Sequence, residues 1–128
     1  MKFLSIQPIV PSGNDFEKSK QLFIELGFRM TWCDSDYADF VSDECKFVLQ
    51  RLDKSEFAQN YMLIVDIDSA AEFRSMALNK NLAEKFGIRI SEVNQQPYGK
   101  EVNIIDIAGV CWHFLNDNYL FQKKQQCP

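Results

Sequence analysis

Histidine is almost absent from this sequence, because His113 is the only one among 128 residues. The four cysteines show neither a CxxC pair nor the spacing of metal ligands: Cys33, Cys45, Cys111 and Cys127. A metal site built from several imidazoles of this chain is therefore excluded, and the cysteine spacing does not indicate a thiolate site. No apolar run is long enough to span a membrane, and no signal peptide is recognisable. We expect a cytoplasmic protein with reduced thiols.

Positive charge is also in short supply. The chain has 14 Lys and Arg against 18 Asp and Glu, a net charge of −4. This balance argues against a nucleic-acid partner and is compatible with a cationic ligand or partner. Hydrophobic residues make up 46% of the chain and charged residues 25%, which is typical of a folded protein. A length of 128 residues fits one domain with a substantial core.

The first half of the chain has the pattern of one strand, one helix and three strands. Asn14 is the expected N-cap of the helix, with Glu17 in the capping-box position. Gly27 is the expected glycine just after the helix C-terminus. The predicted strands are Phe3–Val10, Phe28–Trp32, Tyr37–Val41 and Lys46–Leu52.

The second half repeats this order after a polar connector, Asp53–Asn60. A helix capped by Asp68 or Ser69 is expected to run to Phe86, with a place where it can break around residues 79–81. The predicted strands are Tyr61–Ile67, Ile88–Val93, Val102–Ile105 and Val110–Leu115. The sequence thus predicts a single α+β domain over residues 1–128, with β-α-β-β-β modules at about 3–52 and 61–116 and a polar tail at 117–128. One such module cannot bury a sheet face alone, so we expect the curved mixed sheet to enclose a cleft.

Candidate ligand-facing side chains gather near the end of the second module. Pro97 and Gly99 bracket Tyr98 in a tight bend, which can present its ring. Strand alternation places Cys111 and His113 on one face of the last strand. We expect no nucleophilic pair from these two, because residues two apart on a strand seldom bring sulfur and imidazole into contact.

These features together resemble the glyoxalase/bleomycin resistance/dioxygenase superfamily, the vicinal oxygen chelate fold. The resemblance is carried by the paired modules and by three segments: Leu26-Gly27-Phe28, Gln96-Pro97-Tyr98-Gly99-Lys100-Glu101 and Asp106-Ile107-Ala108-Gly109. Within the superfamily the likeness is greatest to bleomycin resistance proteins, through the opening Ser5–Val10 and the ending Cys111-Trp112-His113-Phe114. The resemblance implies a homodimer, in which an arm ahead of Pro8, residues Met1–Gln7, crosses to the partner.

The resemblance also bears on metal chemistry. Metal-using enzymes of the superfamily carry ligands at positions that match Gln7, Gln50, Met62 and His113 here, and only His113 is a good donor. We therefore expect no metal, no other cofactor and no enzyme of the metal-dependent type. The plainer interpretation of His113 is an imidazole that fills space in the cleft and is hydrogen-bonded to a neighbour.

The aromatic side chains indicate what class of ligand the protein binds. Bleomycin-binding proteins sandwich a flat ring system between aromatic side chains, and the resemblance matches those to Trp32, Tyr37 and Tyr98. Two positions depart from the family pattern: Ile64 stands where a further Trp is found on the fifth strand, and Tyr98 stands where the loop has a Trp. The groove would therefore stack a ligand less strongly, or suit another planar ligand. Three carboxylates beside the rings favour a cation: Asp34, Asp36 and Asp39. The alternative for Trp32 and Tyr37 is ordinary packing at a sheet surface.

Three hypotheses follow. The first is a non-catalytic antibiotic-binding protein of bleomycin resistance type that sequesters a planar aromatic cation in a groove at the dimer interface. Its ligand-binding set would be Trp32, Tyr37, Tyr98, Asp36, His113 and Gln50. The second is a glyoxalase-like lyase or isomerase acting on a small metabolite, with His113 transferring the proton. The third is a dimeric module that binds a metabolite, because fold does not fix function.

Overall fold

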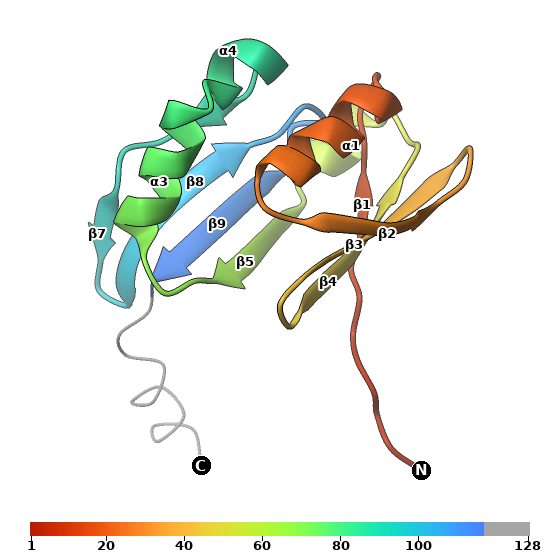
Figure 1. The fold of residues 1–128 in the computed structure, drawn as a ribbon, viewed down its shortest axis with the longest axis horizontal. Helices are drawn as coiled ribbons and strands as arrows, with labels where there is room; N and C mark the ends of the chain where they lie inside the picture. Colours follow the sequence, from red (N-terminus) through yellow and green to blue (C-terminus); the bar gives the residue numbers. More distant parts are fainter. Residues whose placement is uncertain (117–128) are drawn as a thin grey trace. The chain divides into compact units, whose positions relative to one another are not determined.

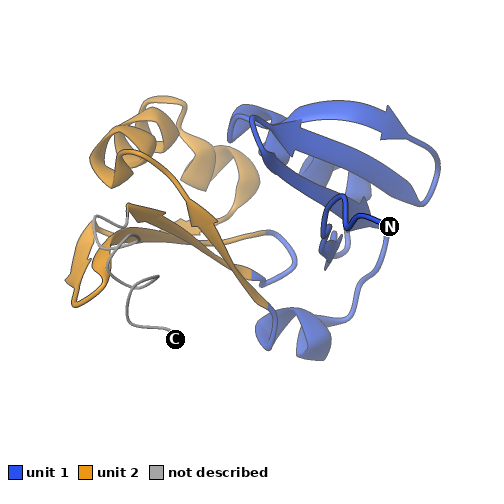
Figure 2. Cartoon of the chain, turned by 90° about the horizontal axis from the view of Figure 1, so that it is seen from below, with its two compact units in different colours: residues 1–61, 107–110 blue, residues 62–106, 111–128 orange. Residues whose placement is uncertain are grey.

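The computed structural model describes residues 1–116 of the chain (Figure 1). They form two compact units, coloured in Figure 2, and each is described by itself. Unit 1 comprises Met1–Tyr61 with Ile107–Val110, and unit 2 comprises Met62–Asp106 with the chain from Cys111. Each unit contains one β-α-β-β-β module with a mixed sheet, which confirms the expected fold class. None of the helices within the described residues is long and apolar enough to cross a membrane.

Unit 1 is a four-stranded sheet with one long helix on it. Its strands are β1 (Ile9–Pro11), β2 (Arg29–Cys33), β3 (Tyr37–Ser42) and β4 (Cys45–Gln50), in the order β1-β4-β3-β2. The helices are α1 (Phe16–Glu25) and the short α2 (Ser55–Gln59). Strands β1 and β4 are parallel, and the other pairs are antiparallel.

Phenylalanine builds the core between α1 and this sheet. The ring of Phe23 lies 4.9 Å from that of Phe47 and 5.9 Å from that of Phe40, centroid to centroid. Phe28 meets Phe47 edge-on at 5.0 Å. Edge-on and offset ring pairs contribute about 0.5–1.5 kcal/mol each beyond the area they bury. Because α1 covers this face, the opposite face of the sheet remains for other contacts.

The ends of α1 follow the expected chemistry with one shift. The N-cap is Asp15, not Asn14, and its carboxylate accepts a hydrogen bond from the backbone N–H of Lys18 at 3.0 Å. At the other end, the N–H groups of Gly27 and Phe28 donate to Ile24 and Phe23. This is the Schellman pattern, for which Gly27 supplies a φ of 113°.

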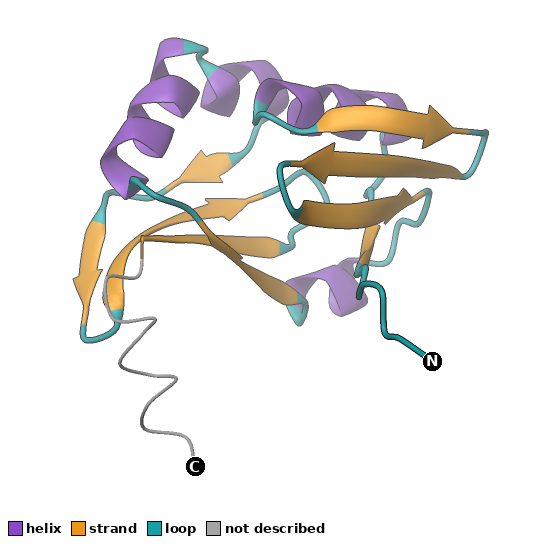
Figure 3. Ribbon diagram, turned by 60° about the horizontal axis from the view of Figure 1, so that its bottom comes forward, coloured by secondary structure: helices purple, strands orange, loops and turns teal. Residues whose placement is uncertain are grey.

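Unit 2 repeats the plan with one more strand. Its strands are β5 (Met62–Asp66), β6 (Arg89–Ile90), β7 (Asn94–Gln96), β8 (Gly99–Ile105) and β9 (Cys111–Asn116). Their order is β5-β9-β8-β6, with β7 also paired to β8, and β5 is parallel to β9. Helices α3 (Ala70–Asn79) and α4 (Leu82–Phe86) lie on one side of β8 and β9 (Figure 3).

The core of unit 2 is built on Phe114 and Trp112 of β9. The ring of Phe73 from α3 stacks on Phe114 at 4.0 Å. The buried indole N–H of Trp112 donates to the carboxylate of Asp106 at 2.8 Å. Ser69 caps α3, and the helix breaks at Asn81, as the sequence indicated. Alternation along β9 then directs Cys111 and His113 to the face away from α3.

Three expectations about secondary structure were wrong. The first strand begins at Ile9 instead of Phe3. The parallel register with β4 starts with Ile9 opposite Val48, directly after Pro8, which has no N–H to donate to the ladder. The connector after β4 contains the helix α2. The expected strand Ile88–Val93 is reduced to β6, Arg89–Ile90, and β7 follows it at Asn94–Gln96. The polar tail at 117–128 lies outside the described residues.

The residues ahead of β1 form an arm that leaves the sheet (Figure 1). Its apolar side chains lie in solvent, with Phe3, Leu4 and Ile6 at 93%, 90% and 94% exposure. The carbonyl of Pro8 accepts from the N–H of Val48 at 2.9 Å, so the sheet ladder starts there.

Candidate functional site

The sheet of unit 1 carries candidate residues on the face opposite α1. We call this surface the aromatic face: Ile9, Trp32, Tyr37, Asp39, Val48 and Gln50. The strand register places these side chains on one side, because residues opposite each other on paired strands point the same way. Trp32 is 52% exposed and Tyr37 is 38% exposed, so both rings are open to a ligand.

A β-bulge in β2 turns Trp32 onto the aromatic face. Met30 lies opposite the buried Phe40, yet Trp32, two residues later, lies opposite Asp39. If the ladder continued past Met30 without a bulge, Thr31 would be opposite Asp39, and Trp32 would be opposite Ala38, which faces the core. The hydroxyl of Thr31 donates to the carbonyl oxygen of Asp39 at 3.4 Å, which ties the bulge to β3. Bulges commonly re-aim a side chain in this way.

Tyr37 is fixed at the start of β3 by the turn before it. The carboxylate of Asp34 accepts hydrogen bonds from the N–H groups of Asp36 and Tyr37, both at 2.8 Å. These two bonds lower the pKa of Asp34, so its carboxylate holds the turn over a wide pH range. The amide of Gln50 donates to the Tyr37 hydroxyl at 3.3 Å. The structure thus brings Trp32, Tyr37 and Gln50 together on one face.

Asp36 lies at the edge of this face and has a cation beside it. Its carboxylate is 3.9 Å from Nε of Arg51, and both side chains are exposed. Arg51 is itself held, since its Nε donates to the carbonyl of Ser35 at 2.7 Å and its guanidinium lies over the Phe16 ring. The positive charge of Arg51 therefore offsets part of the negative field of Asp36. The carboxylate that shares the aromatic face with Trp32 and Tyr37 is that of Asp39.

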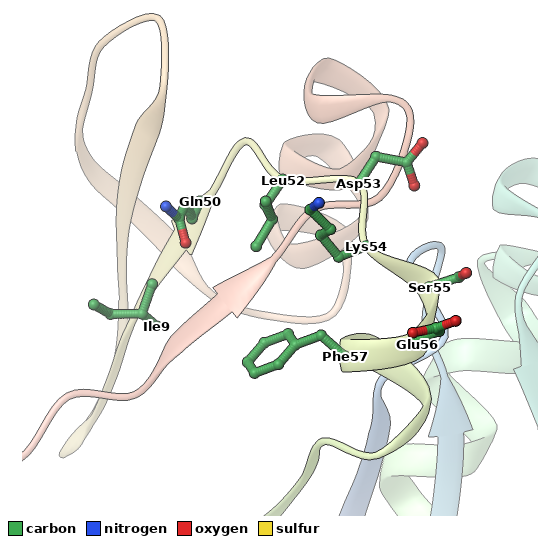
Figure 4. Close-up of a pocket in the computed structure, with 8 residues that line it drawn as sticks. All are labelled: Ile9, Gln50, Leu52, Asp53, Lys54, Ser55, Glu56 and Phe57. Carbon is green, nitrogen blue, oxygen red and sulfur yellow. The ribbon is translucent and has the colours of Figure 1, made fainter.

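A pocket of ≈ 730 Å³ adjoins the aromatic face within unit 1. Its wall is formed by Ile9, Gln50 and the segment 52–57. Figure 4 shows Leu52 and Phe57 pointing into the space beside Ile9, whereas Asp53, Ser55 and Glu56 point to the other side. The ring of Phe57 also meets Tyr61 edge-on at 5.4 Å. The helix α2, which the sequence did not predict, thus supplies an apolar wall next to Gln50.

The other two predicted site residues, Tyr98 and His113, meet in unit 2 around Glu101. We call this group the Glu101 cluster: Tyr98, Glu101, Asn103, Cys111 and His113. Glu101 is only 4% exposed. It accepts from the Tyr98 hydroxyl at 3.0 Å and from the Asn103 amide at 3.4 Å, and Nδ1 of His113 lies 3.7 Å from its Oε1. The carboxylate is buried with donors around it, as a buried charge requires.

Tyr98 occupies the two-residue turn of the β7–β8 hairpin, which confirms the predicted tight bend. Its ring is half-buried. The hydrogen bond to Glu101 raises the pKa of the Tyr98 hydroxyl, because that bond is made by the protonated form. Tyr98 is therefore oriented by Glu101 within this chain.

One expectation about this cluster was wrong. Sγ of Cys111 lies 3.4 Å from Nε2 of His113, so the sulfur and the imidazole are in contact although they are two residues apart. Contact is made because the His113 ring turns along its own strand, with Nδ1 toward Glu101 and Nε2 toward Cys111. Burial is the largest cause that raises the pKa of the Cys111 thiol, with the charges of Glu101 and Asp106 adding to it.

The four positions that match metal ligands do not form one set of neighbours within either unit. In unit 1, Gln7 precedes β1, while Gln50 is opposite Pro11, four residues further on. In unit 2, Met62 is opposite Cys111, and the residue opposite His113 is Ile64. Across residues 1–116, no group of three or more His, Cys, Asp or Glu is arranged to hold a metal ion.

Sequence reasoning missed the role of Glu101, which joins Tyr98 to His113. The sequence did contain a signal for it. Glu101 and Asn103 are two residues apart on β8, so they share one face of the strand, and Asn103 is opposite His113. A buried carboxylate on the face of the only histidine is a candidate partner for it.

Two β-α-β-β-β units of this kind define the glyoxalase/bleomycin resistance fold of the vicinal oxygen chelate superfamily, which confirms the resemblance at the level of fold. No protein-family model and no curated protein sequence matches the chain. At the level of particular structures, it is similar to a bleomycin resistance determinant encoded on the transposon Tn5, with 17% identity, a TM-score of 0.75, and coverage of 91% of this chain and 99% of that one.

Two further solved structures show the same fold. The bleomycin-binding protein from Streptomyces verticillus, complexed with copper(II)-bleomycin, has 20% identity and a TM-score of 0.70, covering 90% of this chain and 97% of that one. The fosfomycin resistance protein from Listeria monocytogenes, complexed with Mn(II) and sulfate, has 10% identity and a TM-score of 0.74, covering 98% and 99%. At these identities the likeness establishes the fold, and function must be argued from residues.

Proposed function

We propose that this protein binds and sequesters a planar, aromatic, cationic antibiotic of the bleomycin type without altering it chemically. The ligand lies in a groove at a homodimer interface, between Tyr98 of one subunit and Trp32 or Tyr37. His113, Gln50 and Asp36 complete the contacts. The proposal rests chiefly on one observation: the bulge at Thr31 turns Trp32 out of the core and onto an open face shared with Tyr37.

The energetic support comes from the rings. The exposed rings of Trp32 and Tyr37 present apolar surface to water on the same face. A flat ligand that covers these rings removes that surface from water, which favours binding. Each ring pair adds about 0.5–1.5 kcal/mol beyond area burial. The hydrogen bond of Gln50 to the Tyr37 hydroxyl holds that ring in place and reduces the entropy that binding would cost.

Charge supports a cationic ligand. Asp39 shares the aromatic face with both rings, and the chain carries a net charge of −4. Exposed carboxylates act through a field that salt screens, so this contribution is smaller than stacking and depends on ionic strength. Because Arg51 is beside Asp36, we assign the larger electrostatic share to Asp39.

The arm supports the dimer. Three large apolar side chains ahead of Pro8 lie in solvent within one chain: Phe3, Leu4 and Ile6. Such a segment is expected to cover its apolar side chains against another copy. Solved structures of the same fold include a bleomycin-binding protein complexed with bleomycin, which makes a ligand of this class a reasonable first choice.

The test is a titration of the purified protein with metal-free bleomycin, followed by intrinsic fluorescence, beside a neutral planar compound. Replacing Trp32 or Tyr98 with Ala removes a stacking face and should cost about 1–3 kcal/mol, roughly 5- to 150-fold in dissociation constant. Trp32→Phe is the matched control, because it keeps a π-face and should cost less. Asp36→Asn should change mainly the salt dependence. Binding no tighter than that of the neutral compound, or an unchanged affinity in Tyr98→Ala, would show the proposal to be wrong.

One observation favours a second candidate, a lyase or isomerase acting on a small metabolite. His113 lies between a buried carboxylate and a thiol, an arrangement that suits proton transfer. Metal analysis of protein purified without chelators separates the two candidates, because the metal-dependent enzymes of this fold require an ion that sequestration does not.

A further inference from the structure

The Glu101 cluster has the geometry of a nucleophile with its base and an orienting carboxylate. Cys111 Sγ is 3.4 Å from His113 Nε2, and His113 Nδ1 is 3.7 Å from Glu101 Oε1. Glu101 is in turn held by the Tyr98 hydroxyl at 3.0 Å and the Asn103 amide at 3.4 Å. Nucleophile, base and third group in this order are the recognised signature of an activated thiol.

The two neighbours of His113 suit one tautomer. An ionised carboxylate can only accept, so the tautomer that suits Glu101, 3.7 Å away, has its proton on Nδ1. Nε2 is then an acceptor, and the Cys111 thiol is the donor that faces it. This is the state in which an imidazole can remove the thiol proton.

The state of the thiol makes that base necessary. Burial and the charges of Glu101 and Asp106 raise the pKa of Cys111, so at neutral pH it is a protonated thiol. A protonated thiol is a poor nucleophile. It reacts only when a base in contact with it takes the proton as the new bond forms, and His113 is in that position.

An apolar approach leads to the sulfur. Met62 of β5 is opposite Cys111 and Ile64 is opposite His113, and these two side chains are 68% and 65% exposed. On the other flank, Ile105 of β8 is opposite Cys111. The partner chemistry that fits a soft sulfur between apolar side chains is a soft carbon electrophile.

We propose that Cys111 is a nucleophile that captures α,β-unsaturated carbonyl compounds covalently, with His113 as its base and Glu101 as the positioning residue. The sulfur forms a bond to the β-carbon while the carbon–carbon π bond breaks. The thiol proton passes to His113 Nε2 and from there to the α-carbon, so no oxidant and no leaving group is needed. This activity does not rest on the proposed sequestration of a cation.

The test uses acrylamide, a small α,β-unsaturated amide, and peptide mass spectrometry to follow each cysteine separately. Cys33 is exposed and serves as the reference within the same molecule. We expect Cys111 of the native protein to react at least about tenfold faster than Cys33, because general base catalysis contributes about 10²–10⁴-fold and partial burial offsets some of it. A Cys111 rate equal to or below that of Cys33 would overturn the proposal without any variant.

Two variants assign the roles. His113→Ala should slow Cys111 at least about tenfold and leave Cys33 unchanged, since the base is lost. Glu101→Gln keeps the shape of the side chain and should slow Cys111 by a smaller factor. Far-UV circular dichroism and an unchanged Cys33 rate verify that each variant is folded. If Cys111 keeps its native rate in folded His113→Ala, the base is not His113 and the proposal is wrong.

Discussion

The N-terminal arm allows a quantitative prediction about assembly. Phe3, Leu4 and Ile6 are almost fully exposed within one chain. Replacing all three with Ser should therefore leave the stability of an isolated subunit unchanged. Burying one such side chain contributes about 1.5–3 kcal/mol, so half-burial of three against a partner contributes about 2–4 kcal/mol per arm. A two-fold dimer exchanges two arms, so the two arms together stabilise the dimer by about 4–8 kcal/mol. The triple Ser variant should therefore have a dimer dissociation constant about 10³-fold higher or more.

Sedimentation velocity over a range of protein concentrations measures this shift directly. The matched control is Leu78→Ser, which replaces an exposed leucine of α3 outside the arm and should leave dimerisation unchanged. Thermal unfolding of dilute subunits should give the same midpoint for the arm variant and the native chain. The reasoning fails if the native protein is a monomer at micromolar concentration, or if the triple variant dimerises as tightly as the native chain.

Two further predictions concern metal and packing. No divalent metal should be retained after purification without chelators, and stoichiometric zinc, nickel or iron that is lost in His113→Ala would contradict this. Gly13→Ala should lower the free energy of unfolding by about 2–4 kcal/mol, because it adds backbone strain at φ 82° and a Cβ 2.9 Å from Cα of Ala108. The control Gly87→Ala has a similar φ of 67° with open space around it and should cost only about 1–2 kcal/mol in chemical denaturation.

The module order could be predicted because its signals are local. Gly27 ends α1 through a backbone pattern that involves only nearby residues, and Ser69 caps α3 in the same way. The apolar positions Phe16 and Phe23 recur at helical spacing, so the buried side of α1 followed from the sequence. Repetition of these local signals was enough to indicate two similar modules.

Features that depend on pairing between strands could not be predicted. The bulge at Thr31 exists only relative to Asp39, and the sequence of β2 carries no glycine or proline to mark it. The contact of Cys111 with His113 depends on the orientation of the imidazole ring, whose other nitrogen lies 3.7 Å from Glu101 on the neighbouring strand. The start of β1 at Ile9 depends on its pairing with Val48 of β4. In each case the deciding residue is on another strand.

The two open sheet faces differ in chemistry, and this difference supports two separate proposals. On the aromatic face, Trp32 and Tyr37 offer broad π surfaces with Asp39 beside them, which suits a flat cation held by stacking. On the sheet of unit 2, the β5 side chains opposite Cys111 and His113 are Met62 and Ile64, which are apolar, and the buried carboxylate of Glu101 is hydrogen-bonded to its own neighbours. A cation gains little from a carboxylate that is already buried and hydrogen-bonded, whereas a carbon electrophile requires only the thiol and its base. We therefore assign the stacking of the planar cation to Trp32 or Tyr37, with Tyr98 as the second ring, and the covalent chemistry to Cys111 and its base.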